Sequence, residues 1–273
     1  FTGWDAGRIF EAVHHIINQG GFRRINAIYP FSIYPNNLGI LFVLSSIEWT
    51  SRLFKVDGYL VSMVLSVLSV NLAGLVVYYT VKHITQKTTI SLFTWILFYL
   101  LFGFSPWITI PYTDNFSILF PIAVIYIYIT KKSQLLSLRR SLLIGFLLFL
   151  GMYIKPTVAI VLAAIILTES LNWGKKSENL AIYRKLLPVG FIILGGVPAI
   201  LGNAIFHKAL ANNINSEARF TALHYVNMGL NNDSDGVYSS EDIDYSTSFP
   251  SVRERNLGNL ASIKERLVNF GFG

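Results

Sequence analysis

The sequence predicts an all-α protein: a polytopic bundle of transmembrane helices with interfacial helices in an extracytoplasmic loop. Of its 273 residues, 53% are hydrophobic and only 14% are charged, whereas soluble domains average roughly 25% charged residues. Residues 59–81 are a run of 23 residues without a charge, and a hydrocarbon core of about 30 Å requires roughly 20 apolar residues in a helix. The net charge of +7 comes from basic residues gathered between apolar runs. Basic loops between apolar spans orient a membrane protein in the bilayer, which explains this pattern. We therefore expect no nucleic-acid binding.

The N-terminal region, residues 1–58, is predicted to be an extracytoplasmic loop. Residues 6–18 have an apolar stripe at helical spacing, which predicts an amphipathic helix. Residues 36–54 are apolar but include Glu48 and Arg52, so we interpret them as a helix lying along the membrane rather than crossing it. If this segment crossed the membrane, the residues before it would face inward.

The region 59–206 is predicted to hold about six spans. Apolar length and helix breakers place them at 59–81, 88–104, 115–130, 141–154, 157–172 and 186–206. The fourth and fifth meet at Lys155 and Pro156, either as two helices joined by a tight turn or as one broken helix.

Sidedness follows from three loops rich in Lys and Arg, at 82–87, 131–140 and 175–185. Alternating spans put all three on one side, which should be the cytoplasm. The N-terminal loop, residues 105–114, the turn at Lys155 and the polar segment 207–273 then face outward. The last segment is expected to include an amphipathic helix from Ser251 onward and to lead into a further span, and we expect the chain to be a piece of a longer protein.

Several kinds of chemistry are not expected. The chain has no cysteine, which excludes disulfides and thiolate nucleophiles. His14 and His15 are adjacent, so they point to different faces of a helix and do not form a metal-binding pair at i and i+4. We therefore predict neither a metal site nor a cofactor.

Two aspartates on the predicted outer face are candidate functional residues, because ionisable groups at membrane depth often mark function. Asp5 is either a helix cap, pairing with Arg8 three residues on, or a catalytic carboxylate held at the membrane surface. Asp114 stands at the outer start of a span, where it either meets the positive end of the helix dipole or joins Asp5 in a site. Tyr112 beside it is a second candidate or an interface aromatic.

Further candidates lie in the same outer region. Lys155 is the one charge in an apolar stretch of about 28 residues, and it either snorkels to the interface or binds a phosphate as a point charge. The loop containing Tyr34, Asn36 and Asn37 either lines a sugar site or forms ordinary turns. His224 is expected in a loop that closes over a substrate.

These pieces together resemble the GT-C glycosyltransferases, in particular bacterial relatives of protein O-mannosyltransferases, aminoarabinose transferases and GPI mannosyltransferases. The resemblance rests on the order of "WD" with an amphipathic helix, "YPNNLGILFVLSSI", "PYTDNFSILFPIAVIYIY", "GFLLFLGMYIKPTVAIVLAAIIL" and "MGLN…DGVYSSEDIDYS". It covers most of the chain. The loop has "WD" where protein O-mannosyltransferases have an Asp-Glu pair, which leaves the acceptor class open.

The resemblance implies an integral membrane glycosyltransferase of the cell envelope, in a bacterial plasma membrane, with its active site facing outward. It would move a sugar from a polyprenyl-phosphate donor to an acceptor hydroxyl on a glycan, lipid or protein. Asp5 would be the general base, Asp114 would help to place acceptor or sugar, and Lys155, with Arg8, would hold the donor phosphate. Such a donor carries no diphosphate and requires no metal.

A polytopic transporter or lipid flippase is the alternative function. It would be expected to show paired broken helices and a repeat between two halves. The sequence has one break and no repeat. A membrane scaffold, with the aspartates only as helix caps, is a further possibility.

Overall fold

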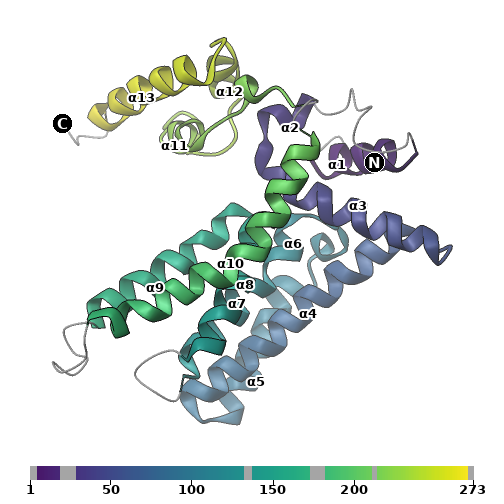
Figure 1. Ribbon diagram of the computed structural model, residues 1–273, viewed down its shortest axis with the longest axis vertical. Helices are drawn as coiled ribbons and strands as arrows, with labels where there is room; N and C mark the ends of the chain where they lie inside the picture. Colours follow the sequence, from purple (N-terminus) through teal and green to yellow (C-terminus); the bar gives the residue numbers. More distant parts are fainter. Residues whose placement is uncertain (1–4, 19–28, 132–136, 173–181, 211–213, 270–273) are drawn as a thin grey trace. The chain divides into compact units, whose positions relative to one another are not determined.

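The computed structural model describes residues 5–18, 29–131, 137–172, 182–210 and 214–269 (Figure 1). Within these ranges every regular element is a helix and none is a strand, so the prediction of an all-α protein is confirmed. The chain divides into two units by its contacts. The bundle unit is formed from Phe1–Gly21 and Asn36–Ala209, and the tail unit from Phe22–Pro35 and Leu210–Gly273. The predicted N-terminal loop 1–58 therefore contributes to both units.

The bundle unit contains the apolar helices. They are α1 (Asp5–Asn18), η3 (Pro35–Asn37), α3 (Leu38–Leu53), α4 (Gly58–Thr85), α5 (Thr88–Phe98), η4 (Tyr99–Gly103), η5 (Pro106–Thr109), α6 (Thr113–Ser117), α7 (Leu119–Ile129), α8 (Leu138–Ile154), η6 (Pro156–Val158), α9 (Ala159–Asn172) and α10 (Ile182–Leu210). Each of the six apolar segments predicted from the sequence is helical. Lys132, Lys175 and Lys176 of the predicted basic loops lie outside the described residues, as does Trp4.

Helix α4 has small residues inside the bundle and large apolar residues outside. Its buried face consists of Gly58, Ser62, Ser66, Val70, Ala73 and Gly74. Its exposed face includes Leu60, Val64, Leu68, Leu72, Leu75 and Tyr79. Small residues at helix contacts and large apolar side chains outside are typical of helices packed in lipid.

Among the residues that the structure describes, two helices are long and apolar enough to cross a membrane, Gly58–Thr85 and Leu187–Phe206. The apolar helices at Thr88–Gly103, Thr113–Ile129 and Pro156–Leu171 are shorter.

Helices α8 and α9 form a hairpin around Lys155, which decides between the two alternatives for this segment. Helix α8 ends at Ile154 and a 3-10 turn begins at Pro156, because proline lacks the amide that would continue the helix. Glu169, near the end of α9, accepts hydrogen bonds from Tyr128 Oη (2.7 Å) in the last turn of α7 and from Lys131 Nζ (2.8 Å) just after α7. The chain therefore returns to the end of the bundle from which α8 started.

Helices α8 and α10 cross through glycine. A Cβ on Gly145 would lie 1.9 Å from the Ile192 carbonyl oxygen, and a Cβ on Gly195 would lie 2.1 Å from the Leu142 carbonyl oxygen. These two approaches are reciprocal, so the backbones themselves are in contact. The core beside the crossing includes Ile144, Leu148 and Ile192.

Helices α1 and α3 pack against each other within the bundle unit. The predicted apolar stripe of α1 is largely confirmed, since Ile9, Val13 and Ile16 are buried. Helix α3 is buried mainly in its first half: Ile40 and Leu44 are buried, but Leu53 is 63% exposed. The reason is Gly39, because its missing side chain lets the start of α3 approach the backbone of α8 at Tyr153 and buries this half of the helix.

The tail unit is polar. Its helices are α2 (Tyr29–Ile33), η7 (Ser216–Ala218), α11 (Ala222–Gly229), α12 (Ser240–Thr247) and α13 (Val252–Asn269). Helix α13 confirms the helix predicted from Ser251 onward. Arg255 is 4% exposed and donates hydrogen bonds to the carbonyls of Ser246 (2.7 Å), Glu217 (2.9 Å), Arg219 (3.0 Å) and Phe249 (2.9 Å), which joins α13 to the loops around it.

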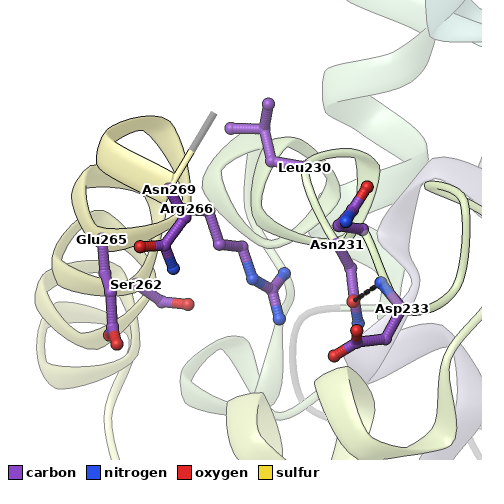
Figure 2. Close-up of a pocket in the computed structure, with 8 residues that line it drawn as sticks. Leu230, Asn231, Asp233, Ser262, Glu265, Arg266 and Asn269 are labelled. Carbon is purple, nitrogen blue, oxygen red and sulfur yellow. Dashed lines mark hydrogen bonds between the residues drawn. The ribbon is translucent and has the colours of Figure 1, made fainter. Parts of the chain in front are cut away.

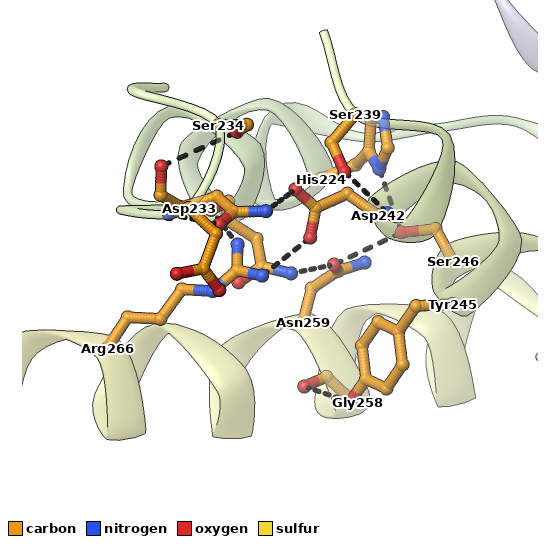
Figure 3. Close-up of polar contacts among 12 residues, drawn as sticks. His224, Asp233, Ser234, Ser239, Asp242, Tyr245, Ser246, Gly258, Asn259 and Arg266 are labelled. Carbon is orange, nitrogen blue, oxygen red and sulfur yellow. Dashed lines mark hydrogen bonds and ion pairs between the residues drawn. The ribbon is translucent and has the colours of Figure 1, made fainter. Parts of the chain in front are cut away.

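The placement of His224 in a loop was wrong. His224 lies in α11, is 1% exposed, and its Nδ1 is 2.8 Å from Ser246 Oγ of α12 (Figure 3). Because this hydroxyl satisfies the ring nitrogen, the residue can be buried in a helix contact rather than left at a substrate opening.

Candidate functional site

The candidate site is built around the start of α6, where two polar contacts join distant parts of the bundle unit. Asp114, in the first turn of α6, forms an ion pair with the ammonium of Lys155, at the end of α8. The Asp114 side chain is 63% exposed and the Lys155 side chain 30%. The pair is therefore open to a ligand on the Asp114 side.

The second contact joins α1 to the residue before α6. The Tyr112 hydroxyl donates a hydrogen bond of 3.2 Å to Oδ2 of Asp5, 107 positions away in the sequence. Asp5 is the first residue of α1 and is exposed. Its carboxylate lies where the helix dipole stabilises negative charge.

The chain before α6 is fixed by two polar side chains that sequence reasoning did not single out. Asn115 donates to the carbonyls of Trp107 (2.6 Å) and Ile110 (2.8 Å), and Ser66 of α4 donates to the carbonyl of Ile108 (2.8 Å). These bonds set the position of Tyr112 and Asp114. Asn115 follows Asp114 directly and could have been recognised as a turn residue, but no signal in the sequence pairs Ser66 with this loop.

Two opposing effects act on the charge of Lys155. Burial lowers the pKa of the Lys155 ammonium, because the charged form loses hydration. The adjacent Asp114 carboxylate favours the charged form. The ammonium has three donors, so it can hold Asp114 and a second anionic oxygen at the same time.

Arg8 does not pair with Asp5 as proposed from the sequence. Its guanidinium lies 3.8 Å from Glu11 Oε2, and both side chains are more than half exposed. Glu11 follows Arg8 by three positions, just as Asp5 precedes it by three, so the same helical spacing allows either pair. In the pair with Glu11, both charged groups remain exposed to water.

Asn36 and Asn37 lie at the start of α3, where the Asn36 amide donates to Asn37 Oδ1 at 3.3 Å. Asn37 is 7% exposed. It stands at the N-cap of α3 without a side-chain hydrogen bond to the start of the helix.

Tyr34 and His224 belong to the tail unit, where Phe220 connects them. The Tyr34 and Phe220 rings meet edge to face with centroids 5.4 Å apart, and Phe220 lies 3.9 Å from the His224 ring. Together with Phe220, these two residues form an aromatic cluster within the tail unit.

The described residues contain no group of three or more His, Cys, Asp or Glu side chains able to hold a metal ion. The cluster of Asp5, Tyr112, Asp114 and Lys155 instead offers two carboxylates, a phenol and an ammonium. Such a set can accept a proton, position a hydroxyl and neutralise an anion.

The chain matches the model of a protein family. A family model described as "Conserved hypothetical integral membrane protein" matches residues 1–273. No curated protein matches the chain, and no solved structure matches it.

Proposed function

We propose that this chain, which belongs to that family of integral membrane proteins, is a polytopic glycosyltransferase of a bacterial plasma membrane. It would transfer a sugar from a polyprenyl-phosphate donor to an acceptor hydroxyl at the outer face. The acceptor is a glycan, lipid or protein of the cell envelope. The observation that carries this proposal is the presence of two polar pairs at the start of α6, Tyr112 with Asp5 and Asp114 with Lys155.

The location of the cluster within the bundle unit supports an outward-facing site. Lys82 and Arg140 lie near the other ends of the helices that connect to it, at the end of α4 and the start of α8. Loops rich in Lys and Arg stay in the cytoplasm. The cluster would then open at the outer interface, where the isoprenoid tail of the donor lies in the bilayer and its phosphate reaches the surface.

Asp5 is the proposed general base. The acceptor hydroxyl oxygen attacks the anomeric carbon of the sugar while its proton passes to the Asp5 carboxylate. A new glycosidic C–O bond forms, the bond from the anomeric carbon to the phosphate oxygen breaks, and the phosphate leaves with the electron pair. The hydrogen bond from Tyr112 holds the carboxylate in place for this proton transfer.

Lys155 is the proposed phosphate ligand. Negative charge grows on the phosphate as the glycosidic bond breaks, and a fixed cation lowers the energy of that charge. Asp114 orients the ammonium through the ion pair, and the remaining donors of Lys155 face the phosphate. We assign Arg8 no role in this step, because its guanidinium lies beside Glu11.

The test is the variant Asp5→Asn in the full-length protein reconstituted in lipid vesicles. We expect sugar transfer from a panel of polyprenyl-phosphate sugars to fall at least about a hundredfold, since general-base catalysis contributes about 10²–10⁴. Transfer is measured with radiolabelled sugar. The amount of folded protein, measured by size-exclusion chromatography, should not change.

Glu11→Gln is the matched control, because it also replaces a carboxylate on α1 by an amide. This variant should transfer sugar at the normal rate. Full activity of Asp5→Asn would remove Asp5 from the mechanism. Absence of transfer by the unaltered protein, together with movement of the lipid-linked sugar across the vesicle membrane, would instead support the transporter.

A further inference from the structure

The tail unit contains a polar pocket between α13 and the turn that follows α11 (Figure 2). Its volume is about 390 Å³, within the range of small-molecule sites, roughly 300–1,000 Å³. The lining residues are Leu230, Asn231, Asn232, Asp233, Ser262, Glu265, Arg266 and Asn269. All but Leu230 are polar, although ligand pockets are usually mostly apolar.

The base of this pocket is fixed by a buried ionic network (Figure 3). Arg266 of α13 donates to Asp242 Oδ1 of α12 at 2.6 Å and also to the carbonyl of Asn227 in α11. Asn231 donates to the other oxygen of Asp242 at 2.8 Å. Asp242 is only 3% exposed. Three helices are therefore locked together beneath the pocket, and its walls exist before any ligand binds.

The rim of the pocket offers hydrogen-bonding groups that the fold itself does not use. Among the described residues, the side chains of Asn232, Ser262 and Glu265 have no hydrogen-bond or ion-pair partner. An amide both donates and accepts, a carboxylate accepts, and a hydroxyl does both. This mixture matches a ligand that carries several hydroxyl groups.

The charge of the pocket selects against anions. The one cation, Arg266, is neutralised by Asp242. Asp233 and Glu265 then leave the lining negative. A phosphate or carboxylate ligand would be repelled by these two carboxylates, whereas a neutral hydroxyl donates to them.

We propose that this pocket binds a neutral polyhydroxylated ligand of the size of a hexose. Its hydroxyls donate to Asp233 and Glu265 and exchange hydrogen bonds with Asn232 and Ser262. This site goes beyond the proposed transferase activity, because it lies in the tail unit and uses none of the residues at the start of α6.

The experiment is a binding measurement on the full-length protein in lipid nanodiscs. The probes are the methyl α-glycosides of glucose, galactose and mannose, observed by saturation-transfer difference NMR. We expect saturable binding of at least one of them, with a dissociation constant on the order of 1 mM. Glu265→Gln should weaken that binding about tenfold, because hydrogen bonds to a charged acceptor are stronger than those to a neutral one. Ser262→Trp should abolish it by filling the pocket while the network below stays intact.

Glu254→Gln is the matched control on the same helix, since Glu254 is exposed and outside the pocket. It should bind sugar normally. Asp5→Asn should also bind sugar normally, so a failure of the transferase proposal is distinguishable from a failure of this one. The proposal is overturned if none of the three glycosides binds, if Ser262→Trp binds as well as the unaltered protein, or if inorganic phosphate or ethanolamine binds more tightly than every glycoside.

Discussion

His224 is a buried histidine whose protonation opposes folding. Burial lowers its pKa below the ordinary value of 6.5, Arg255 lowers it further, and Asp242 acts in the opposite direction. The ring faces Ser246 and Phe220, and it contacts Tyr225 edge to face. The folded tail unit therefore holds a neutral imidazole at a pH where the unfolded chain already begins to bind a proton.

The tail unit should lose stability as the pH falls below about 6.5. Between the lowered pKa of the folded protein and the pKa of the unfolded chain, the unfolded chain binds more protons. The contribution of the neutral imidazole to the free energy of unfolding is therefore fully present above pH 6.5. It declines toward pH 5.5, by at most about 1.4 kcal/mol per pH unit. Hydrogen exchange of the α11 amides at pH 7.5 and 5.5 measures this. His224→Gln should flatten the difference between the two pH values, and His83→Gln, at an exposed position, should leave it unchanged. An equal difference in all three proteins would exclude His224 as its source.

Single residues were predictable where their chemistry conflicts with their surroundings. Lys155 and Asp114 stood out because they are charges beside apolar runs. Their ion pair could not be derived, because 41 positions separate them and helix packing alone brings them together. His224 was assigned to a loop because its neighbours include turn-forming residues. Its partner Ser246 lies 22 positions further on and gives no local signal.

At the scale of the elements, the crossing of α8 and α10 depends on the absence of a side chain at Gly145. Gly145→Ala places a methyl group against the Ile192 carbonyl, so the helices must separate, at a cost of about 1–3 kcal/mol. Gly202→Ala is the matched control in α10, since a Cβ there would meet nothing within 4 Å. Equilibrium unfolding in detergent measures both.

Both substitutions gain the same intrinsic helix propensity. The difference between the free energies of unfolding of the two variants therefore reports on the helix crossing alone. A Gly145→Ala protein as stable as Gly202→Ala would mean that the two helices are not in close contact.

Helix positions were predictable because apolar length and breakers such as Pro156 are local features. The pairing of helices was not, because every glycine in an apolar helix is a possible crossing point and only the folded chain selects among them.

For the whole molecule, the membrane orientation can be tested directly because the chain has no native cysteine. A membrane-impermeant maleimide should label His14→Cys and Thr109→Cys in intact cells. His83→Cys, beside the basic end of α4, should react only after permeabilisation. All three positions are exposed in the structure.

The His14→Cys result decides the orientation of the N-terminal region. Labelling of Thr109→Cys without labelling of His14→Cys would mean that residues 38–53 cross the bilayer, and Asp5 would then face the cytoplasm.

The class of the molecule was predictable from the sequence, because a composition with so few charged residues suits lipid rather than water as the surrounding medium. The two units could not be predicted, because residues 29–35 associate with a distant segment: the Asn215 amide donates a hydrogen bond to Ser32 Oγ, 183 positions away.

The row of leucine and valine side chains along α4 makes the surrounding amphiphile part of the native fold. If detergent is stripped during purification, this row faces water, at a cost of roughly 25 cal/mol for each Å² of apolar surface. Molecules would then adhere to one another along α4. This aggregation would result from the exposure of apolar surface to water rather than from unfolding of the chain.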